Sequence, residues 1–142
     1  MIELDLDRDE AEALAWIDSL GPALLEQTLA WSAVNSGSGN LPGLERMAAL
    51  IGAELERLGG TMTLRDPAPF AYPDTRGDLQ PVAHGRNLHF RRDAPGAANR
   101  VLLVGHMDTV FGVDHPFQTA RWLDEHTVCG PGVAAMKGGI VV

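Results

Sequence analysis

A histidine and an aspartate, His106 and Asp108, stand two residues apart directly after a short apolar run. The run covers residues 101–104 and reads VLLV, a pattern typical of a β-strand buried on both faces. In open α/β sheets, ligands bind just beyond the carboxyl ends of the strands. An imidazole at such a place can bind a metal ion, and a carboxylate two residues on is close enough to orient the imidazole. The spacing therefore predicts His106 as a metal ligand with Asp108 beside it.

A glycine-rich segment, residues 130–139, follows about 25 residues later and reads GPGVAAMKGG. Its glycines suit tight turns and close packing, and Lys137 suits either solvent or an anion at a helix start. Residues 130–135 also fit the dinucleotide-binding fingerprint G-x-G-x-x-A. That fingerprint should follow an apolar strand, whereas residues 123–128 are mostly polar. A non-catalytic nucleotide-binding module is therefore the alternative hypothesis for this segment.

The two motifs together resemble those of the di-zinc exopeptidases and amidohydrolases, which include glutamate carboxypeptidases, aminoacylases and acetylornithine deacetylases. Residues 105–110, GHMDTV, match the first metal motif of that family, and residues 130–139 are similar to the second in all but one position. The loop over 35–40 and the segment over 42–58 also resemble its N-terminal region. The resemblance implies an α/β fold over 1–142, the N-terminal part of a catalytic domain with helices packed on a mixed or parallel sheet. It also implies that the small lid and dimerisation domain of the family is absent from these residues.

By this resemblance, His106 is similar to a ligand of one of two Zn²⁺ ions. Asp108 is similar to the active-site carboxylate that holds the imidazole in one tautomer. The family places an aspartate that bridges both ions where this chain has Ala135, which carries no ligand atom. Its catalytic glutamate and remaining ligands follow the second motif, and its zinc-activated water hydrolyses peptide or N-acyl amino-acid bonds. We therefore expect a fragment of a zinc-dependent metallohydrolase that is inactive alone and holds zinc weakly or partially, or a disarmed pseudoenzyme.

Composition excludes several other classes of protein. The 142 residues include 11 basic and 19 acidic side chains, a formal charge of −8, which argues against nucleic acid and against an anionic membrane surface as partners. The single cysteine, Cys129, forms no intrachain disulfide. The acidic N-terminus has no signal-peptide pattern, and no apolar run approaches the ~18 residues of a membrane span. We expect a cytoplasmic protein that acts on a small peptide or N-acyl amino acid, and a homodimer only where the lid domain is present.

The elements that must position these residues follow from periodicity and from turn residues. Helical spacing of apolar residues predicts three helices, and a further helix begins near Ala135. Residues 35–40 are a flexible loop by composition, and the proline-rich residues 66–83 a long surface loop. Two histidines, His115 and His126, are expected on the surface, while His84 and His89 have no partner motif. The expected helices cover 9–20, 22–31 and 42–58, and the expected strands 61–65, 87–91 and 101–104.

Overall fold

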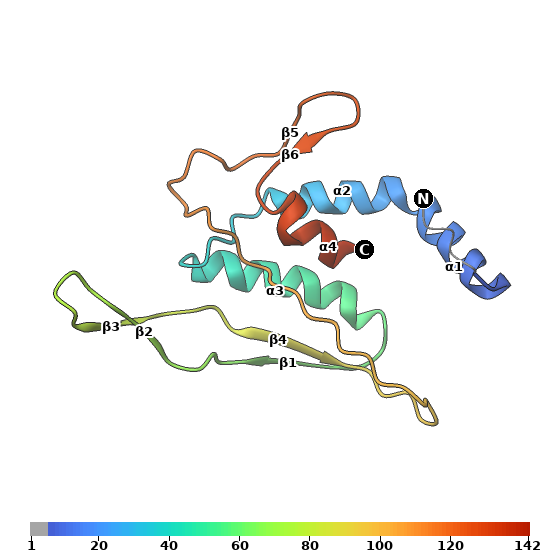
Figure 1. The fold of residues 1–142 in the computed structure, drawn as a ribbon, viewed down its shortest axis with the longest axis horizontal. Helices are drawn as coiled ribbons and strands as arrows, with labels where there is room; N and C mark the ends of the chain where they lie inside the picture. Colours follow the sequence, from blue (N-terminus) through green and yellow to red (C-terminus); the bar gives the residue numbers. More distant parts are fainter. Residues whose placement is uncertain (1–5) are drawn as a thin grey trace.

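The computed structural model describes residues 6–142, which combine helices with small antiparallel sheets (Figure 1). The mixed helix-and-sheet class expected from the sequence is confirmed in this general form. Each sheet among the described residues has two antiparallel strands, and the single parallel contact is an isolated bridge between Gly37 and Thr109. The elements are α1 (Arg8–Ser19), α2 (Gly21–Ser32), α3 (Leu41–Glu56), β1 (Thr61–Arg65), β2 (Phe70–Pro73), β3 (Leu79–Val82), β4 (Asn87–Arg91), β5 (Arg121–Trp122), β6 (Val128–Cys129), the π-helical turn η1 (Val133–Lys137) and α4 (Gly138–Val141).

Helix α3 is the central element and begins close to the predicted residue. The Asn40 side chain caps it by accepting a hydrogen bond from the N–H of Gly43 at 3.2 Å, and a proline occupies its first turn. Gly59, with φ +66°, follows its carboxyl end in the left-handed conformation that glycine adopts without strain. The apolar stripe of α3 faces the core, with Met47 fully buried and Ile51 nearly so.

The alternation of both segments correctly predicts β1 and β4 as strands, and the structure pairs them antiparallel beneath α3 (Figure 1). Met62 lies opposite Phe90 in the register, and both side chains are partly buried. A Cβ atom placed on Gly52 of α3 would lie 2.7 Å from the sulfur of Met62, so the helix and the strand are in close contact at that point. The main hydrophobic cluster joins α2 to α3 through Trp31, Val34, Met47 and Ile51.

Residues 66–83 and 101–104 differ in secondary structure from the sequence expectation. Residues 66–83, expected as a long surface loop, contain the hairpin of β2 and β3. Its strands pair across the hairpin although the segment contains several prolines. The larger correction concerns residues 101–104, which form no strand and are 77–89% exposed.

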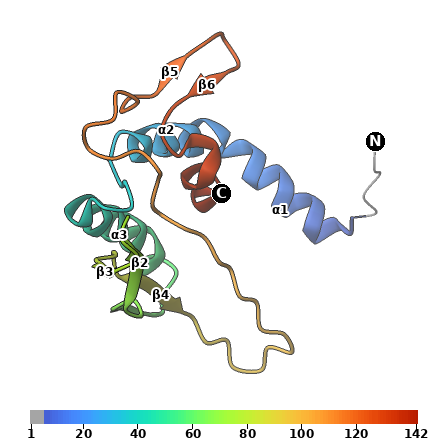
Figure 2. The same cartoon turned by 60° about the vertical axis from the view of Figure 1, so that its left-hand side comes forward.

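A strand buried on both faces needs lateral partners and a covering layer on each side. Among residues 6–142, no main-chain group hydrogen-bonds to residues 101–104. Figure 2 shows this stretch in orange, passing alone from the end of β4 towards α2 and α4. The prediction of a buried strand at this position is therefore wrong for residues 6–142, and no sheet edge within these residues places His106 and Asp108.

The described C-terminal residues return to the core. Helix α4 contacts α2, and its Ile140 and Val141 pack against the α2–α3 cluster together with Met107 (Figure 1). This contact brings the segment after residue 104 back to the body of the protein. No helix in the part of the chain that the structure describes combines the length and the apolar character that a membrane span requires.

Candidate functional site

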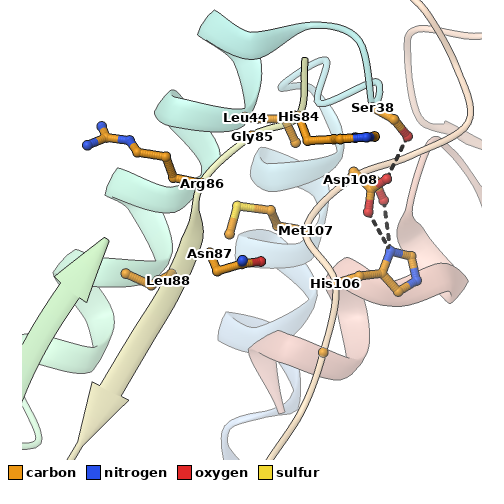
Figure 3. A pocket seen from close by; sticks show the side chains of 11 residues that line it. Ser38, Leu44, His84, Gly85, Arg86, Asn87, Leu88, His106, Met107 and Asp108 are labelled. Atoms are coloured by element: carbon orange, nitrogen blue, oxygen red, sulfur yellow. Dashed lines mark hydrogen bonds and ion pairs between the residues drawn. The ribbon is translucent and has the colours of Figure 1, made fainter. Parts of the chain in front are cut away.

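The His106 imidazole and the Asp108 carboxylate lie side by side, as the sequence predicts (Figure 3). His106 Nδ1 is 3.1 Å from Asp108 Oδ1 and also 3.1 Å from the main-chain oxygen of Asp108. The main-chain oxygen can only accept a hydrogen bond, and the carboxylate oxygen can only accept one when Asp108 is ionised. The proton of the neutral imidazole therefore belongs on Nδ1. The lone pair is then on Nε2, which faces away from the carboxylate (Figure 3). This is the arrangement that suits an imidazole for binding a metal ion.

A serine holds the other side of the carboxylate. The Ser38 hydroxyl donates to Asp108 Oδ2 at 2.6 Å, so each carboxylate oxygen has its own donor. Partial burial raises the pKa of Asp108, but the hydrogen bonds from Ser38 and the imidazole of His106 outweigh that effect and hold the pKa below its ordinary value. Asp108 is therefore ionised at neutral pH and able to accept both bonds.

Hydrogen bonds from the loop over residues 35–40, and not from a sheet, position residues 107–109. The Ser36 hydroxyl, fully buried, donates to the main-chain oxygen of Met107 at 2.7 Å. Thr109 N donates to Ser36 O at 2.9 Å, and Ser38 N donates to Thr109 O at 3.0 Å. The two segments therefore run together as a short parallel ladder, with the bridge between Gly37 and Thr109 at its centre. The expectation of a flexible loop here is wrong, because main-chain and hydroxyl hydrogen bonds fix it.

Asn35 extends the same attachment towards the following loop. Its amide nitrogen donates to Gln118 Oε1 at 2.7 Å and lies 3.2 Å from Phe111 O and 3.3 Å from Gly112 O. A Cβ atom on Gly37 would lie 2.4 Å from Phe111 O, so only glycine allows this close approach. The turn that precedes α3 and the stretch after Asp108 are therefore one packed unit.

The glycine-rich segment lies against the metal motif. A Cβ atom on Gly105 would lie 3.4 Å from Met136 in the glycine-rich segment and 3.2 Å from Ile140 just after it, so little space separates these residues from Gly105. Gly132 has φ +74°, and a Cβ atom there would lie 2.8 Å from the side chain of Lys137. The glycines serve tight turns and close packing, as expected. Ala135 is exposed in the same segment and offers no ligand atom.

Lys137 is in the interior of the protein, in contrast to the solvent-exposed or anion-binding position expected from the sequence. It is 1% exposed, and its ammonium group donates to the main-chain oxygens of Trp31 at 3.0 Å and Val34 at 2.7 Å. These carbonyls belong to the last turn of α2 and the residues just after it, the end of a helix at which a cation is favourable. Desolvation lowers the pKa of Lys137 to about 8. Its role is to attach the glycine-rich segment to α2.

A pocket of about 230 Å³ opens beside the His106 and Asp108 pair (Figure 3). Ser38 and His84 line it as well, from the loop before α3 and from the stretch before β4. Sequence reasoning missed both residues. The composition of the loop that contains Ser38 suggested mobility, so Ser38 was not singled out. His84 belongs to no local motif. The signal for Ser38 was the Asn and Ser content of the loop, since these side chains hydrogen-bond main-chain groups.

The described residues fit part of a zinc site. A catalytic zinc ion normally has three protein ligands, whereas residues 6–142 contain no group of three His, Cys, Asp or Glu side chains placed to hold an ion. Within these residues, His106 and Asp108 form an imidazole–carboxylate pair of the kind found at metal-binding histidines. His115 and His126 are exposed, as expected, and Cys129 is partly buried in β6.

The nucleotide-binding hypothesis depends on the structure around the glycine-rich segment. The dinucleotide fingerprint requires a parallel βαβ unit in which the glycines follow a strand and open a helix. Here Gly130 follows the two-residue strand β6 of an antiparallel ribbon, and the chain continues into the short turn η1. Comparison with protein-family models and with curated protein sequences finds no match.

Proposed function

We propose that this chain contributes the first metal-binding motif of a zinc-dependent metallohydrolase that acts on peptide or N-acyl amino-acid bonds. In this proposal, His106 binds zinc through Nε2 and Asp108 orients the imidazole. The α/β unit then corresponds to the N-terminal part of a zinc-exopeptidase catalytic domain.

The geometry of the His106 imidazole is the observation that carries the proposal. Its Nδ1 lies 3.1 Å from Asp108 Oδ1, and its Nε2 is directed away from that carboxylate (Figure 3). The His106 side chain is 55% exposed, so an ion can reach it from solvent. The pocket of about 230 Å³ beside it leaves room for a ligand.

The proposal also includes inactivity of this chain alone. Ala135 stands where the resembling family has a bridging aspartate, and a carboxylate at that position would offset charge between two ions. No group of three ligands is assembled within the described residues. We expect the purified chain to give no zinc-dependent hydrolysis of N-acyl amino acids above the rate without protein, and Ala135→Asp to increase zinc affinity without creating activity.

Zinc titration followed by NMR tests the proposed site residue by residue. Long-range ¹H–¹⁵N spectra at pH 8 resolve the ring nitrogens of all five histidines. We expect zinc to shift Nε2 of His106 at lower concentrations than any nitrogen of the other rings. Asp108→Asn should weaken this response by tenfold or more, in line with the loss of a carboxylate that orients a metal-bound histidine, ~10–100-fold.

The pair of His126 and Glu125 provides a matched control within the same molecule. Their side chains lie 3.2 Å apart and are 84% and 85% exposed, so they form an imidazole–carboxylate pair without a pocket. His126→Ala should leave the zinc response of His106 unchanged. Equal zinc affinity at His126 and His106 would show that proximity to a carboxylate alone explains binding, and the proposed site would be rejected.

A further inference from the structure

We propose that Ser38 is a positioning residue whose hydroxyl fixes the Asp108 carboxylate against the His106 imidazole. The expected effect of Ser38 on metal binding rests on the proposed function. The geometric part of the inference stands on the hydrogen bonds of Ser38 alone.

The bonding pattern of the carboxylate shows what the hydroxyl does. Asp108 Oδ2 accepts from Ser38 at 2.6 Å, while Oδ1 lies 3.1 Å from His106 Nδ1. The shorter bond is therefore the one to Ser38. Without it, the only side-chain contact left to the carboxylate is His106, and that contact competes with the main-chain oxygen of Asp108, which is also 3.1 Å from Nδ1. The imidazole can then remain bonded to the main chain while the carboxylate rotates away.

The main chain of Ser38 is fixed independently of its side chain. Its N–H donates to Thr109 O at 3.0 Å, within the ladder that joins the loop over 35–40 to the metal motif. The hydroxyl is therefore attached to a fixed main chain. Forming its hydrogen bond to Asp108 restricts only one short side chain, which costs little conformational entropy. Removing the hydroxyl leaves this main-chain attachment in place, so Ser38→Ala retains the fold. Ser38 is exposed, which leaves room for the extra methyl group of Ser38→Thr.

The effect on a metal ion follows from this geometry. An ionised carboxylate beside Nδ1 raises the basicity of the imidazole and keeps Nε2 free for the ion. The carboxylate does this only while Oδ1 faces Nδ1. A residue that holds Asp108 in that rotamer therefore strengthens binding at His106 without touching the ion.

The first test uses metal-free protein and reports on the carboxylate itself. Three-bond couplings from Asp108 N and C′ to Cγ distinguish one side-chain rotamer from a rotamer average. We expect a single rotamer in the wild type and in Ser38→Thr, and averaged couplings in Ser38→Ala. Ser19→Ala is the matched control, because Ser19 is also exposed and its hydroxyl makes a 2.6 Å bond to Trp16 O. A single Asp108 rotamer in Ser38→Ala would overturn the inference.

The second test measures zinc binding at His106 with zinc chloride as the only ligand. We expect Ser38→Ala to weaken the Nε2 response about tenfold, with Ser38→Thr and Ser19→Ala equal to the wild type. Averaged Asp108 couplings with unchanged zinc affinity in Ser38→Ala would also overturn the inference. An absence of zinc binding at His106 in the wild type would instead reject the proposed function, and the couplings would still decide the role of Ser38.

Discussion

Replacing Lys137 with methionine should remove a specific rise in stability at alkaline pH. Lys137 is the only lysine in the sequence, and its ammonium group is buried against Trp31 O and Val34 O. Burial lowers its pKa from 10.5 to about 8 in the folded protein. Between these two pH values the unfolded chain binds more protons than the folded protein, so the free energy of unfolding increases with pH. Below about pH 8 the lysine is protonated in both states and contributes no slope.

The size of this effect follows from the two pKa values. One pKa unit corresponds to about 1.4 kcal/mol, so the difference between 10.5 and about 8 corresponds to about 3 kcal/mol. The neutral amine also donates to both carbonyl oxygens, although more weakly than the ammonium group does, so the two hydrogen bonds reduce the effect only in part. We therefore expect the free energy of unfolding to rise by about 1–3 kcal/mol from pH 7.5 to pH 10.5.

Urea unfolding of the wild type and Lys137→Met at both pH values measures this effect. The two proteins differ only at position 137, so contributions from all other side chains cancel in the comparison. The difference in unfolding free energy between the two proteins should shift by about 1–3 kcal/mol between the two pH values, in favour of the wild type at pH 10.5. The same pH dependence in both proteins would refute the assignment of a buried, desolvated ammonium group.

Two further predictions concern the segments that carry the site. Gly132→Ala should destabilise the protein more than Gly77→Ala, by at least about 1 kcal/mol in urea unfolding: both glycines have positive φ, but a Cβ atom meets the side chain of Lys137 only at Gly132. Equal losses would contradict the close packing of the glycine-rich segment. Asn35→Ala should lower the free energy of unfolding by about 1–3 kcal/mol and increase amide hydrogen exchange at Thr109, because the Asn35 amide joins the loop before α3 to residues 111–118. Exchange at Thr109 like that of the wild type would contradict this prediction. Asn99→Ala, at an exposed asparagine, is the control.

The helices and two of the strands could be predicted because their signals are local. The Asn40 cap, the apolar stripe of α3 and the alternation in β1 and β4 each depend on neighbours within a few residues. Contacts between distant segments gave no such signal. The hydroxyl of Ser36 bonds to Met107 and that of Ser38 to Asp108, at separations of 71 and 70 residues. A Ser- and Gly-rich composition describes both a mobile loop and a loop fixed by hydroxyl hydrogen bonds.

The two clearest errors have the same physical origin. The apolar run over 101–104 has the composition of a buried strand, but burial depends on partners that pair with it, and none is present among residues 6–142. Lys137 is of a residue type usually found on the surface, but two main-chain carbonyls at the carboxyl end of α2 accept hydrogen bonds from its ammonium group in the interior. In both cases the environment supplied by other segments decided the outcome. By contrast, a spacing of two residues already places His106 and Asp108 within reach of each other, so this part of the site had a local signal.

Anomalous X-ray scattering at the zinc edge, from crystals equilibrated with zinc chloride, tests the central claim most directly. The account predicts a zinc peak ~2.0–2.1 Å from Nε2 of His106, the usual zinc–nitrogen distance, with Asp108 still bonded to Nδ1. A zinc peak at Nδ1, or zinc bound elsewhere on the protein and none at His106, would contradict it.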